Sequence, residues 1–225
     1  MTKTGDTDPK QKLTGSQVDA ERLAGWTFAL DELATRITCA DFAAALRLVD
    51  AIGAAAEAAN HHPDLDLRWG RVDVRTSSHD VGGVTARDVD LARTVTRIVE
   101  EQGAEQESAT VARYELALDT PDAAGIRPFW AALQGMKESG PDAWSDLRDP
   151  YDRIPTLWFQ ESGSEEPRQR WHPDLWIDPS QVQDRIDAAL AAGGTLVSDE
   201  HAPSFWVLAD PQGNRACICT WQDRG

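Results

Sequence analysis

The segment EAANHHPDLDLRW (Glu57–Trp69) decides how the first part of the chain folds. Before it, apolar residues recur at helical spacing between Asp41, which suits an N-cap, and Ala56. Pro63 cannot continue a helix, and it pushes the residue before it out of the α region. We therefore predict a helix that ends at or just before the pair His61–His62.

Outward from this helix, the sequence predicts further elements of an α+β domain. The alternating segment Arg71–Ser77 is typical of a half-buried strand. The tetrapeptide TARD (Thr85–Asp88) has the form of a capping box and opens another helix. Closer to the N-terminus, Thr14–Leu23 fits a short helix, and Trp26–Leu30 with Glu32–Ile37 fits a hairpin.

The histidine pair indicates a site for proton transfer. Glu57 lies four residues before His61, so on a continuous helix the two side chains share one face, where the carboxylate can orient the imidazole. A helix C-terminus also favours a protonated histidine. His79 follows the predicted strand and leads into a glycine turn that lets backbone approach a ligand. Imidazoles and a carboxylate at loop ends suit general acid/base catalysis.

Two other interpretations of these histidines remain open from the residues alone. Three histidines and a glutamate could ligate zinc. Adjacent histidines rarely both reach one ion without strain, however, and the chain has no H-x-x-x-H or C-x-x-C spacing. A purely structural role is the third interpretation. The residues favour the acid/base site over both.

The spacing of these residues resembles the signature of the pterin-4a-carbinolamine dehydratases. The matching positions are Glu57, His61-His62-Pro63, Trp69, His79 and Gly82-Gly83. The resemblance covers residues 11–100. It implies three helices on one face of a four-stranded antiparallel sheet, and often a homo-oligomer, either a dimer or a tetramer.

The resemblance also implies an activity, the dehydration of a 4a-hydroxytetrahydropterin substrate to quinonoid dihydropterin with neither a metal nor another cofactor. The implied catalytic residues are His61, His79 and Glu57, with Glu57 orienting His61. The implied substrate-binding residues are His62, Asp88 and Trp69. The capping box also accounts for Asp88 locally. Asn60 departs from the family pattern, which has an aspartate at this position.

The second half of the chain contains an internal repeat. Residues Tyr114–Leu133 resemble Trp171–Leu190, and the corresponding Glu115 and His172 are 57 residues apart (172 − 115). Each copy predicts a strand, a turn, a helix and further strands. The further strands predicted are Trp144–Leu147, Thr156–Gln160, Thr195–Ser198, Phe205–Ala209 and Arg215–Thr220.

This half resembles the glyoxalase/bleomycin-resistance/dioxygenase domains, or vicinal oxygen chelate superfamily. The repeat and the segment LADPQGN (Leu208–Asn214) carry the resemblance, over residues 110–222. It implies paired βαβββ units, usually around a divalent metal with ligands from both units. Glu115 and His172 are possible ligands, but Arg215 replaces the usual last-strand carboxylate, and the repeat offset equates it with Trp158 (215 − 57). We therefore predict no metal in this domain.

Tryptophans and cysteines in this half allow more than one interpretation. Seven of the nine tryptophans follow residue 110, and they could stack on a flat ligand or, as we favour, fill a core or an interface. Cys217 and Cys219 would share one face of a strand, which fits a metal or, as we favour, buried thiols.

The composition limits the possible partners and location. The formal net charge of −16 disfavours nucleic acid and anionic membranes as partners. No apolar run approaches the roughly 20 residues of a membrane span, and the N-terminus lacks the apolar core of a signal peptide. Three cysteines make a poor disulfide framework. We expect a cytoplasmic protein.

The sequence thus predicts a two-domain enzyme. The predicted divisions are a disordered tail at 1–10, a dehydratase-like domain at 11–100, a linker at 101–109 and a glyoxalase-like domain at 110–225. The alternative is a small-molecule-binding or regulatory protein, or a metalloenzyme, that acts through the second domain.

Overall fold

The computed structural model describes residues 10–107, 112–142, 144–152, 154–162, 171–191, 193–209 and 215–224. The chain forms two compact units. Unit 1 comprises residues 1–111 and 221–225, and unit 2 comprises residues 112–220. The predicted disordered tail lies outside the described residues, apart from Lys10.

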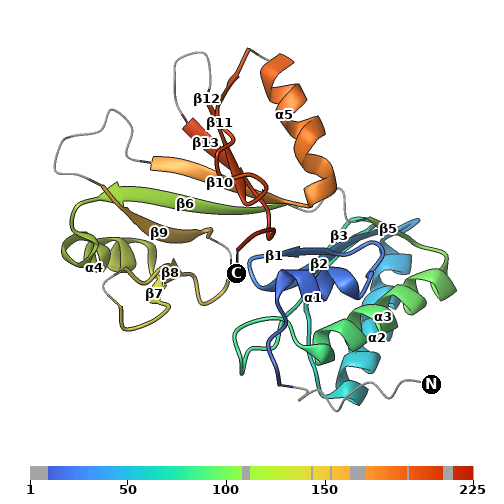
Figure 1. The fold of residues 1–225 in the computed structure, drawn as a ribbon. Coiled ribbons are helices and arrows are strands. Elements are labelled where there is room, and N and C mark those ends of the chain that lie inside the picture. The colour runs from blue at the N-terminus through green and yellow to red at the C-terminus, as the bar shows by residue number, and fades with distance from the viewer. Residues whose placement is uncertain are drawn as a thin grey trace, which may run out of the picture. The chain divides into compact units, whose positions relative to one another are not determined.

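Unit 1 is an antiparallel sheet covered by helices. Its elements are α1 (Gly15–Ala20), β1 (Thr27–Ala29), β2 (Glu32–Thr38), α2 (Phe42–Ala59), β3 (Asp64–Arg68), β4 (Arg71–Thr76), α3 (Ala86–Gln102) and β5 (Glu105–Glu107). The strand order β1-β2-β4-β3 confirms the predicted four-stranded antiparallel sheet, and the three helices lie on the same side of it (Figure 1). The short strand β5 adds to β2 as a fifth strand.

The core of unit 1 forms where the apolar faces of α2 and α3 meet the sheet. Leu48 and Ile52 from α2, Val95 from α3, and Val72 and Val74 from β4 are all fully buried. The helical residues follow the spacing of one helix face, and the strand residues alternate with half-buried neighbours. Burial of such side chains typically stabilises a fold by about 1.5–3 kcal/mol each.

Three features of unit 1 differ from the sequence prediction or were absent from it. Residues 101–107, assigned to a linker, instead complete α3 and form β5, which pairs with β2. Gly103 ends α3 in the left-handed conformation, and this turn directs the chain back to the sheet. Strand β3 was not predicted, although Leu65 and Leu67 alternate with charged residues.

Unit 2 is an eight-stranded sheet built from two similar halves. The first half contains β6 (Ala112–Thr120), α4 (Ala123–Gln134), β7 (Lys137–Glu138), β8 (Leu147–Arg148) and β9 (Thr156–Glu161). The second half contains β10 (Trp171–Ile177), the short helix η1 (Pro179–Gln181), α5 (Val182–Ala191), β11 (Thr195–Ser198), β12 (Phe205–Ala209) and β13 (Arg215–Cys219). The strand order is β11-β12-β13-β10-β6-β9-β8-β7, so β6 and β10 lie side by side at the centre (Figure 1). This arrangement confirms the predicted paired βαβββ units.

The strand register corrects one equivalence drawn from the repeat. Ala117 of β6 pairs with Trp158 of β9, and Asp174 of β10 pairs with Cys217 of β13. Since Ala117 and Asp174 are themselves one repeat apart (174 − 117 = 57), Trp158 corresponds to Cys217 and not to Arg215. The predicted equivalence of Arg215 and Trp158 is wrong. The second half has two more residues between its first and last strands than the first half has between the matching strands.

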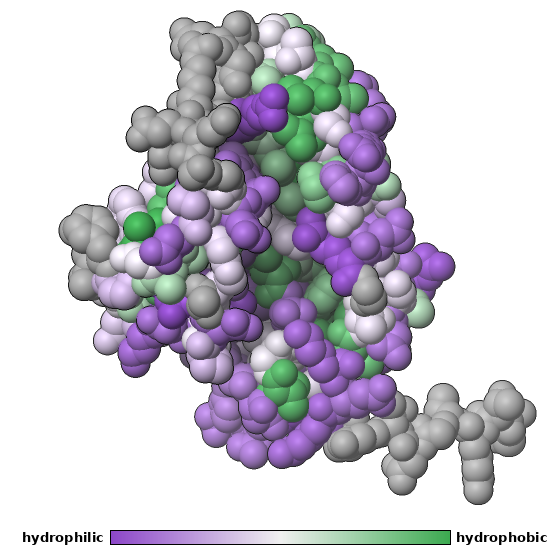
Figure 2. Space-filling view, turned by 60° about the vertical axis from the view of Figure 1, so that its left-hand side comes forward, coloured by the Kyte–Doolittle hydropathy of each residue, from purple (hydrophilic) through white to green (hydrophobic). Residues whose placement is uncertain are grey.

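The surface of the chain is predominantly hydrophilic on the face drawn in Figure 2, where hydrophobic residues appear in separate patches. Among the residues that the structure describes, no helix combines the length and the apolar character needed to cross a membrane.

Candidate active site

The end of α2 places the two histidines in different environments. Asn60 adopts the left-handed conformation (φ 48°, ψ 42°), which asparagine tolerates better than most residues. The backbone N–H of His61 then donates to the carbonyl of Ala56 across a distance of 3.1 Å. This turn directs the His61 side chain inward, where it is 8% exposed, whereas His62 is exposed.

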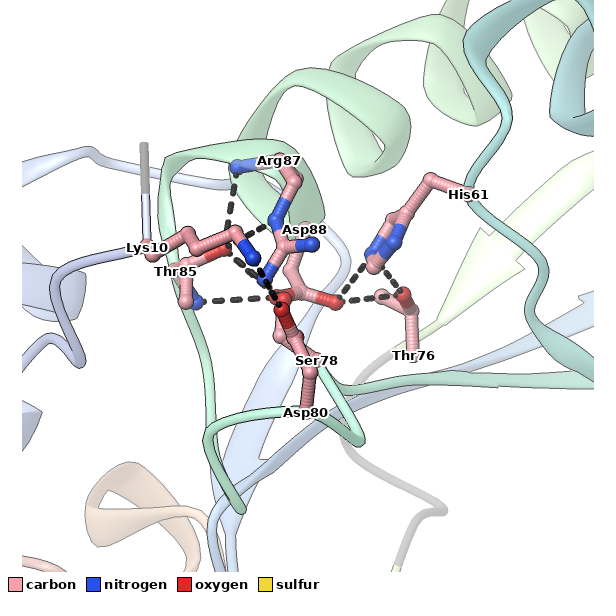
Figure 3. Close-up of polar contacts among 8 residues, drawn as sticks. All are labelled: Lys10, His61, Thr76, Ser78, Asp80, Thr85, Arg87 and Asp88. Atoms are coloured by element: carbon pink, nitrogen blue, oxygen red, sulfur yellow. Dashed lines mark hydrogen bonds and ion pairs between the residues drawn. The ribbon is translucent and has the colours of Figure 1, made fainter. Parts of the chain in front are cut away.

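His61 contacts a buried carboxylate (Figure 3). Its Nε2 lies 2.6 Å from Asp88 Oδ1, and Thr76 donates to the same oxygen at 2.7 Å. Ser78 donates to Asp88 Oδ2 at 2.7 Å, and the backbone N–H of Thr85 donates to Oδ2 at 2.8 Å. Both oxygens of Asp88 are therefore held by groups from three places in the fold, the turn after α2, the end of β4 with the residues that follow it, and the N-cap of α3.

The hydrogen bonds decide the charge of Asp88. Burial alone raises the pKa of this carboxyl, but donors from Ser78, Thr76, the Thr85 backbone and His61 outweigh burial and hold the pKa below its usual value. An ionised Asp88 can only accept hydrogen bonds, so a neutral His61 places its ring proton on Nε2. Nδ1 is then the unprotonated imidazole nitrogen, the one that can accept a proton.

Asp88 has two structural roles, one for each of its carboxylate oxygens. With Thr85 it completes the predicted capping box at the start of α3, and with His61 it forms the buried pair. Its side chain is fully buried. That Asp88 binds substrate directly stays a prediction, and in the structure both of its oxygens are engaged by protein groups.

The prediction that Glu57 orients His61 is also wrong. Glu57 Oε1 lies 3.2 Å from Nε2 of His62, and both side chains are largely exposed. The i,i+4 argument fails because the helix ends at Ala59, so His61 lies beyond the last helical turn. Glu57 and His62 instead form a solvated pair beside the buried one.

Replacing Glu57 by alanine is accordingly expected to change the free energy of unfolding by less than about 1 kcal/mol, as is typical of exposed ion pairs. Urea unfolding of the Glu57→Ala and wild-type chains would measure this. A loss above about 2 kcal/mol would mean that Glu57 supports the buried pair after all.

His79 and Trp69 both lie in exposed turns. His79 is in the turn between Ser78 and Gly83, and Trp69 follows β3 with 80% of its surface exposed. The sequence predicted that His79 acts together with His61 and that Trp69 binds the substrate. The hydrogen bonds of His61 in the structure are with Asp88 and Thr76. Both side chains are accessible to a bound molecule.

Ion pairs hold the turn that carries His79 (Figure 3). Arg87 Nη2 lies 2.7 Å from Asp80 Oδ1, and Lys10 Nζ lies 3.3 Å from Asp80 Oδ2. Ser78 and Gly83 pair across the base of the turn. The turn is thereby anchored to the first turn of α3, which also supplies Asp88.

Unit 2 carries a second polar cluster on one face of its sheet. Asp174 Oδ2 accepts from Trp158 Nε1 at 3.0 Å, and Asp174 Oδ1 lies 3.1 Å from His172 Nδ1. The other imidazole nitrogen, Nε2, lies 3.0 Å from Gln160 Oε1 and 3.6 Å from Asp119 Oδ1. Burial lowers the pKa of His172, but Asp174 and then Asp119 outweigh burial and raise it.

Glu115, the other possible metal ligand, pairs with Asp174 across β6 and β10 and is engaged by a tryptophan. Its Oε2 accepts from Trp176 Nε1 at 2.9 Å. Burial is the main reason that the pKa of Glu115 rises to about 7, and the negative charge of Asp174 adds to the effect.

The raised pKa of Glu115 predicts a specific pH dependence. Since the folded state binds this proton more tightly than the unfolded state, folding stability falls as the pH rises from about 4.5 to about 7. In EDTA, Glu115→Gln should remove that loss, which is at most about 3 kcal/mol, so the variant is more stable than wild type at pH 8. Denaturant unfolding at pH 5 and pH 8 would measure it. Glu161→Gln, at an exposed position of β9, is the control, and identical pH dependence in both variants would contradict the prediction.

Comparison with known proteins gives a match for each unit. Residues 11–98 match the family model described as pterin 4 alpha carbinolamine dehydratase, and residues 115–219 match one described as a glyoxalase-like domain. Both matches confirm the resemblances found in the sequence.

Among curated proteins, the relatives are named pterin-4-alpha-carbinolamine dehydratase. One from Nocardia farcinica is 45% identical over 76 residues, which cover 34% of this chain and 80% of the relative. One from Thermosynechococcus vestitus is 37% identical over 90 residues, covering 39% of this chain and 95% of the relative.

Similar solved structures include a transcriptional coactivator/pterin dehydratase from Brucella melitensis. It is 28% identical with a TM-score of 0.38, covering 39% of this chain and 98% of the other. A glyoxalase/bleomycin resistance protein/dioxygenase superfamily member from Vibrio splendidus 12B01 is 13% identical with a TM-score of 0.35, covering 49% of this chain and 99% of the other. Because it is 45% and 37% identical to curated relatives of which it covers 80% and 95%, the chain belongs to the pterin 4 alpha carbinolamine dehydratase family through residues 11–98, and residues 115–219 match a glyoxalase-like domain.

Proposed function

We propose that unit 1 dehydrates a 4a-hydroxytetrahydropterin to quinonoid dihydropterin and water by metal-free acid/base catalysis. The observation that carries this proposal is the buried pair of His61 and Asp88 beside the exposed His62. The family membership and the names of the relatives support the choice of substrate.

The reaction needs one proton removed and one delivered, with no change of oxidation state overall. A base takes a proton from a ring nitrogen, the C4a–O bond breaks, and the hydroxyl group leaves as water after it is protonated. His61 suits the role of base, because ionised Asp88 holds Nε2–H and stabilises the imidazolium that forms when Nδ1 accepts a proton. His79, exposed in its anchored turn, is our candidate for the acid.

The exposed residues around this pair suit substrate binding. His62 and Trp69 offer a hydrogen-bonding ring and a flat apolar surface, both accessible from solvent. Glu57 fixes His62 rather than His61. Asn60 adopts the left-handed backbone conformation that ends α2. The family pattern has an aspartate at this position, so asparagine here removes a charge and still allows the turn.

The test of this function is the dehydration of freshly generated 4a-hydroxytetrahydropterin by the purified chain in EDTA. We expect a rate well above the uncatalysed reaction, and the same rate in His201→Ala, which alters an exposed histidine of unit 2. A background rate in folded protein would refute the proposal. The family resemblance also supports a dimeric or tetrameric enzyme, which sedimentation would test. The cytoplasmic location expected from the composition would be tested by cell fractionation.

A further inference from the structure

Three potential metal ligands converge on one face of unit 2. Within the described part of the chain, one ligand atom each from His172, Asp174 and Cys217 lies within 4.8 Å of the others. His172 and Asp174 are two residues apart on β10 and so point to the same face, and Cys217 pairs with Asp174 from the neighbouring strand β13. Two adjacent strands therefore present an imidazole, a carboxylate and a thiol together.

The surroundings of these residues are those of an oriented metal site. Nδ1 of His172 faces Asp174 Oδ1 at 3.1 Å, a separation compatible with two ligands of one ion. The outward-facing atoms are already engaged, since Nε2 lies 3.0 Å from Gln160 Oε1 and Asp174 Oδ2 accepts from Trp158. Ligating histidines and carboxylates usually have such hydrogen bonds on their far side, which fix the ligand orientation.

An unsatisfied carboxylate oxygen gives independent support. Among the residues that the structure describes, none forms a hydrogen bond with the buried Asp119 Oδ1, although it lies 3.6 Å from Nε2 of His172. A cation bound at Nδ1 would fix the ring proton on Nε2, where Asp119 and Gln160 can accept it. The carboxylates of Asp119 and Asp174, which lie 3.6 Å and 3.1 Å from the His172 ring nitrogens, also favour a cation on this face.

We propose that unit 2 binds a Zn²⁺ ion through His172 Nδ1, Asp174 Oδ1 and Cys217 Sγ. Zinc accepts nitrogen, oxygen and thiolate ligands, and three protein ligands leave a fourth position open for water or for an oxygen atom of a small molecule. In tetrahedral geometry the sulfur and nitrogen ligands lie about 3.6 Å apart, so the cluster needs only a small side-chain adjustment to close around the ion.

This site differs from the one that the glyoxalase resemblance implies, which takes ligands from both halves of the domain. Glu115 accepts from Trp176, and Trp158, the counterpart of Cys217, cannot ligate a metal. The donor set of the second half alone fits an ion. The inference replaces the prediction of a metal-free domain, because that prediction took Arg215 as the last-strand position.

The experiment uses Co²⁺ as a spectroscopic probe for the zinc site in the full-length, metal-stripped chain. We expect one equivalent of Co²⁺ to bind, with the near-ultraviolet charge-transfer absorption of a cobalt–thiolate bond, and we expect Zn²⁺ to displace it. Cys217→Ser should abolish this absorption and His172→Gln should weaken Co²⁺ binding at least about 10-fold. Cys39→Ser, at the cysteine of unit 1, should leave both unchanged.

Several results would overturn the proposal. Folded wild-type protein that binds no Co²⁺, or binds several equivalents weakly without thiolate absorption, would show only general attraction to an acidic surface. Absorption that survives Cys217→Ser, or that is lost in Cys39→Ser, would place the thiolate elsewhere. Loss of binding in Glu115→Gln as large as in His172→Gln would show that the ion is held across both halves.

Discussion

Replacing His61 by glutamine is expected to lower kcat for dehydration at least about 100-fold, the usual minimum for loss of a positioned acid/base group. The glutamine amide can still donate to Asp88, so the buried carboxylate keeps a partner and the chain keeps its fold. It cannot accept a proton from the substrate. The substitution thus separates proton transfer from the structural role of the imidazole, and stopped-flow dehydration kinetics would measure the loss.

The matched control for this substitution is His62→Gln, the same change at the neighbouring exposed histidine. Because His62 contacts Glu57 in solvent and not Asp88, we expect mainly a higher KM, with kcat lowered by less than about 10-fold. If His61→Gln kept more than about a third of the wild-type kcat, or if the two variants exchanged these effects, His61 would not be the base.

Replacing Asp88 by asparagine is expected to destabilise unit 1 by about 2–4 kcal/mol at neutral pH and to lower kcat by about 10- to 100-fold. The asparagine side chain replaces one acceptor oxygen with an NH₂ group, which is itself a donor. In either orientation of the amide, this group faces other hydrogen-bond donors. These donors are His61 and Thr76 on one side, and Ser78 and Thr85 on the other. The ring of His61 also loses the charge that holds its proton on Nε2.

The effect of Asp88→Asn on stability should depend on pH. Since the pKa of Asp88 is lower in the folded state, its contribution is fully present above the unfolded-state pKa and is lost as the pH falls through the folded-state pKa. The difference between wild type and variant should therefore be largest near neutral pH and shrink in acid. Unfolding from pH 7 down to pH 3 would show this, with Asp90→Asn, at an exposed acid on α3, as control. A constant difference would mean that Asp88 is not ionised in the fold.

The sequence predicted the elements of unit 1 well because their signals are local. The helix ending at the histidine pair follows from its apolar spacing and Pro63, and the capping box at Thr85 was confirmed. What the sequence could not give was the partner of His61. Asp88 is 27 residues away, and only the packing of α3 against the sheet brings the two together. The local alternative, Glu57, failed because the left-handed Asn60 rotates the next residue off the helix face.

Thr76 and Ser78 were missed as site residues for a related reason. Hydroxyl groups at the end of a strand carry no distinctive motif, and their value as donors depends on the buried carboxylate that they meet. A signal was nevertheless present, since Thr76 falls on the buried face of the alternating strand β4. A buried hydroxyl group needs a hydrogen-bond partner, and Asp88, the acid of the capping box, is the acceptor that Thr76 meets.

In unit 2 the architecture could be predicted from the sequence, but the strand register could not. The repeat found the two strand–helix–strand halves because apolar spacing and turn residues recur in both. The sequence offset then equated Arg215 with Trp158, whereas the corresponding positions are separated by 41 residues in the first half (158 − 117) and 43 in the second (217 − 174). Only the pairing of the strands shows that Cys217 stands beside Asp174.

The most direct test of the account is the protonation state of the two His61 ring nitrogens, measured by ¹⁵N NMR on histidine-labelled protein. If ionised Asp88 holds the imidazole as a base, neutral His61 carries its proton on Nε2 and shows an unprotonated Nδ1, and Asp88→Asn disturbs this preference. A neutral His61 protonated on Nδ1 in the wild-type chain would contradict the account, because the nitrogen assigned to accept the substrate proton would already be occupied.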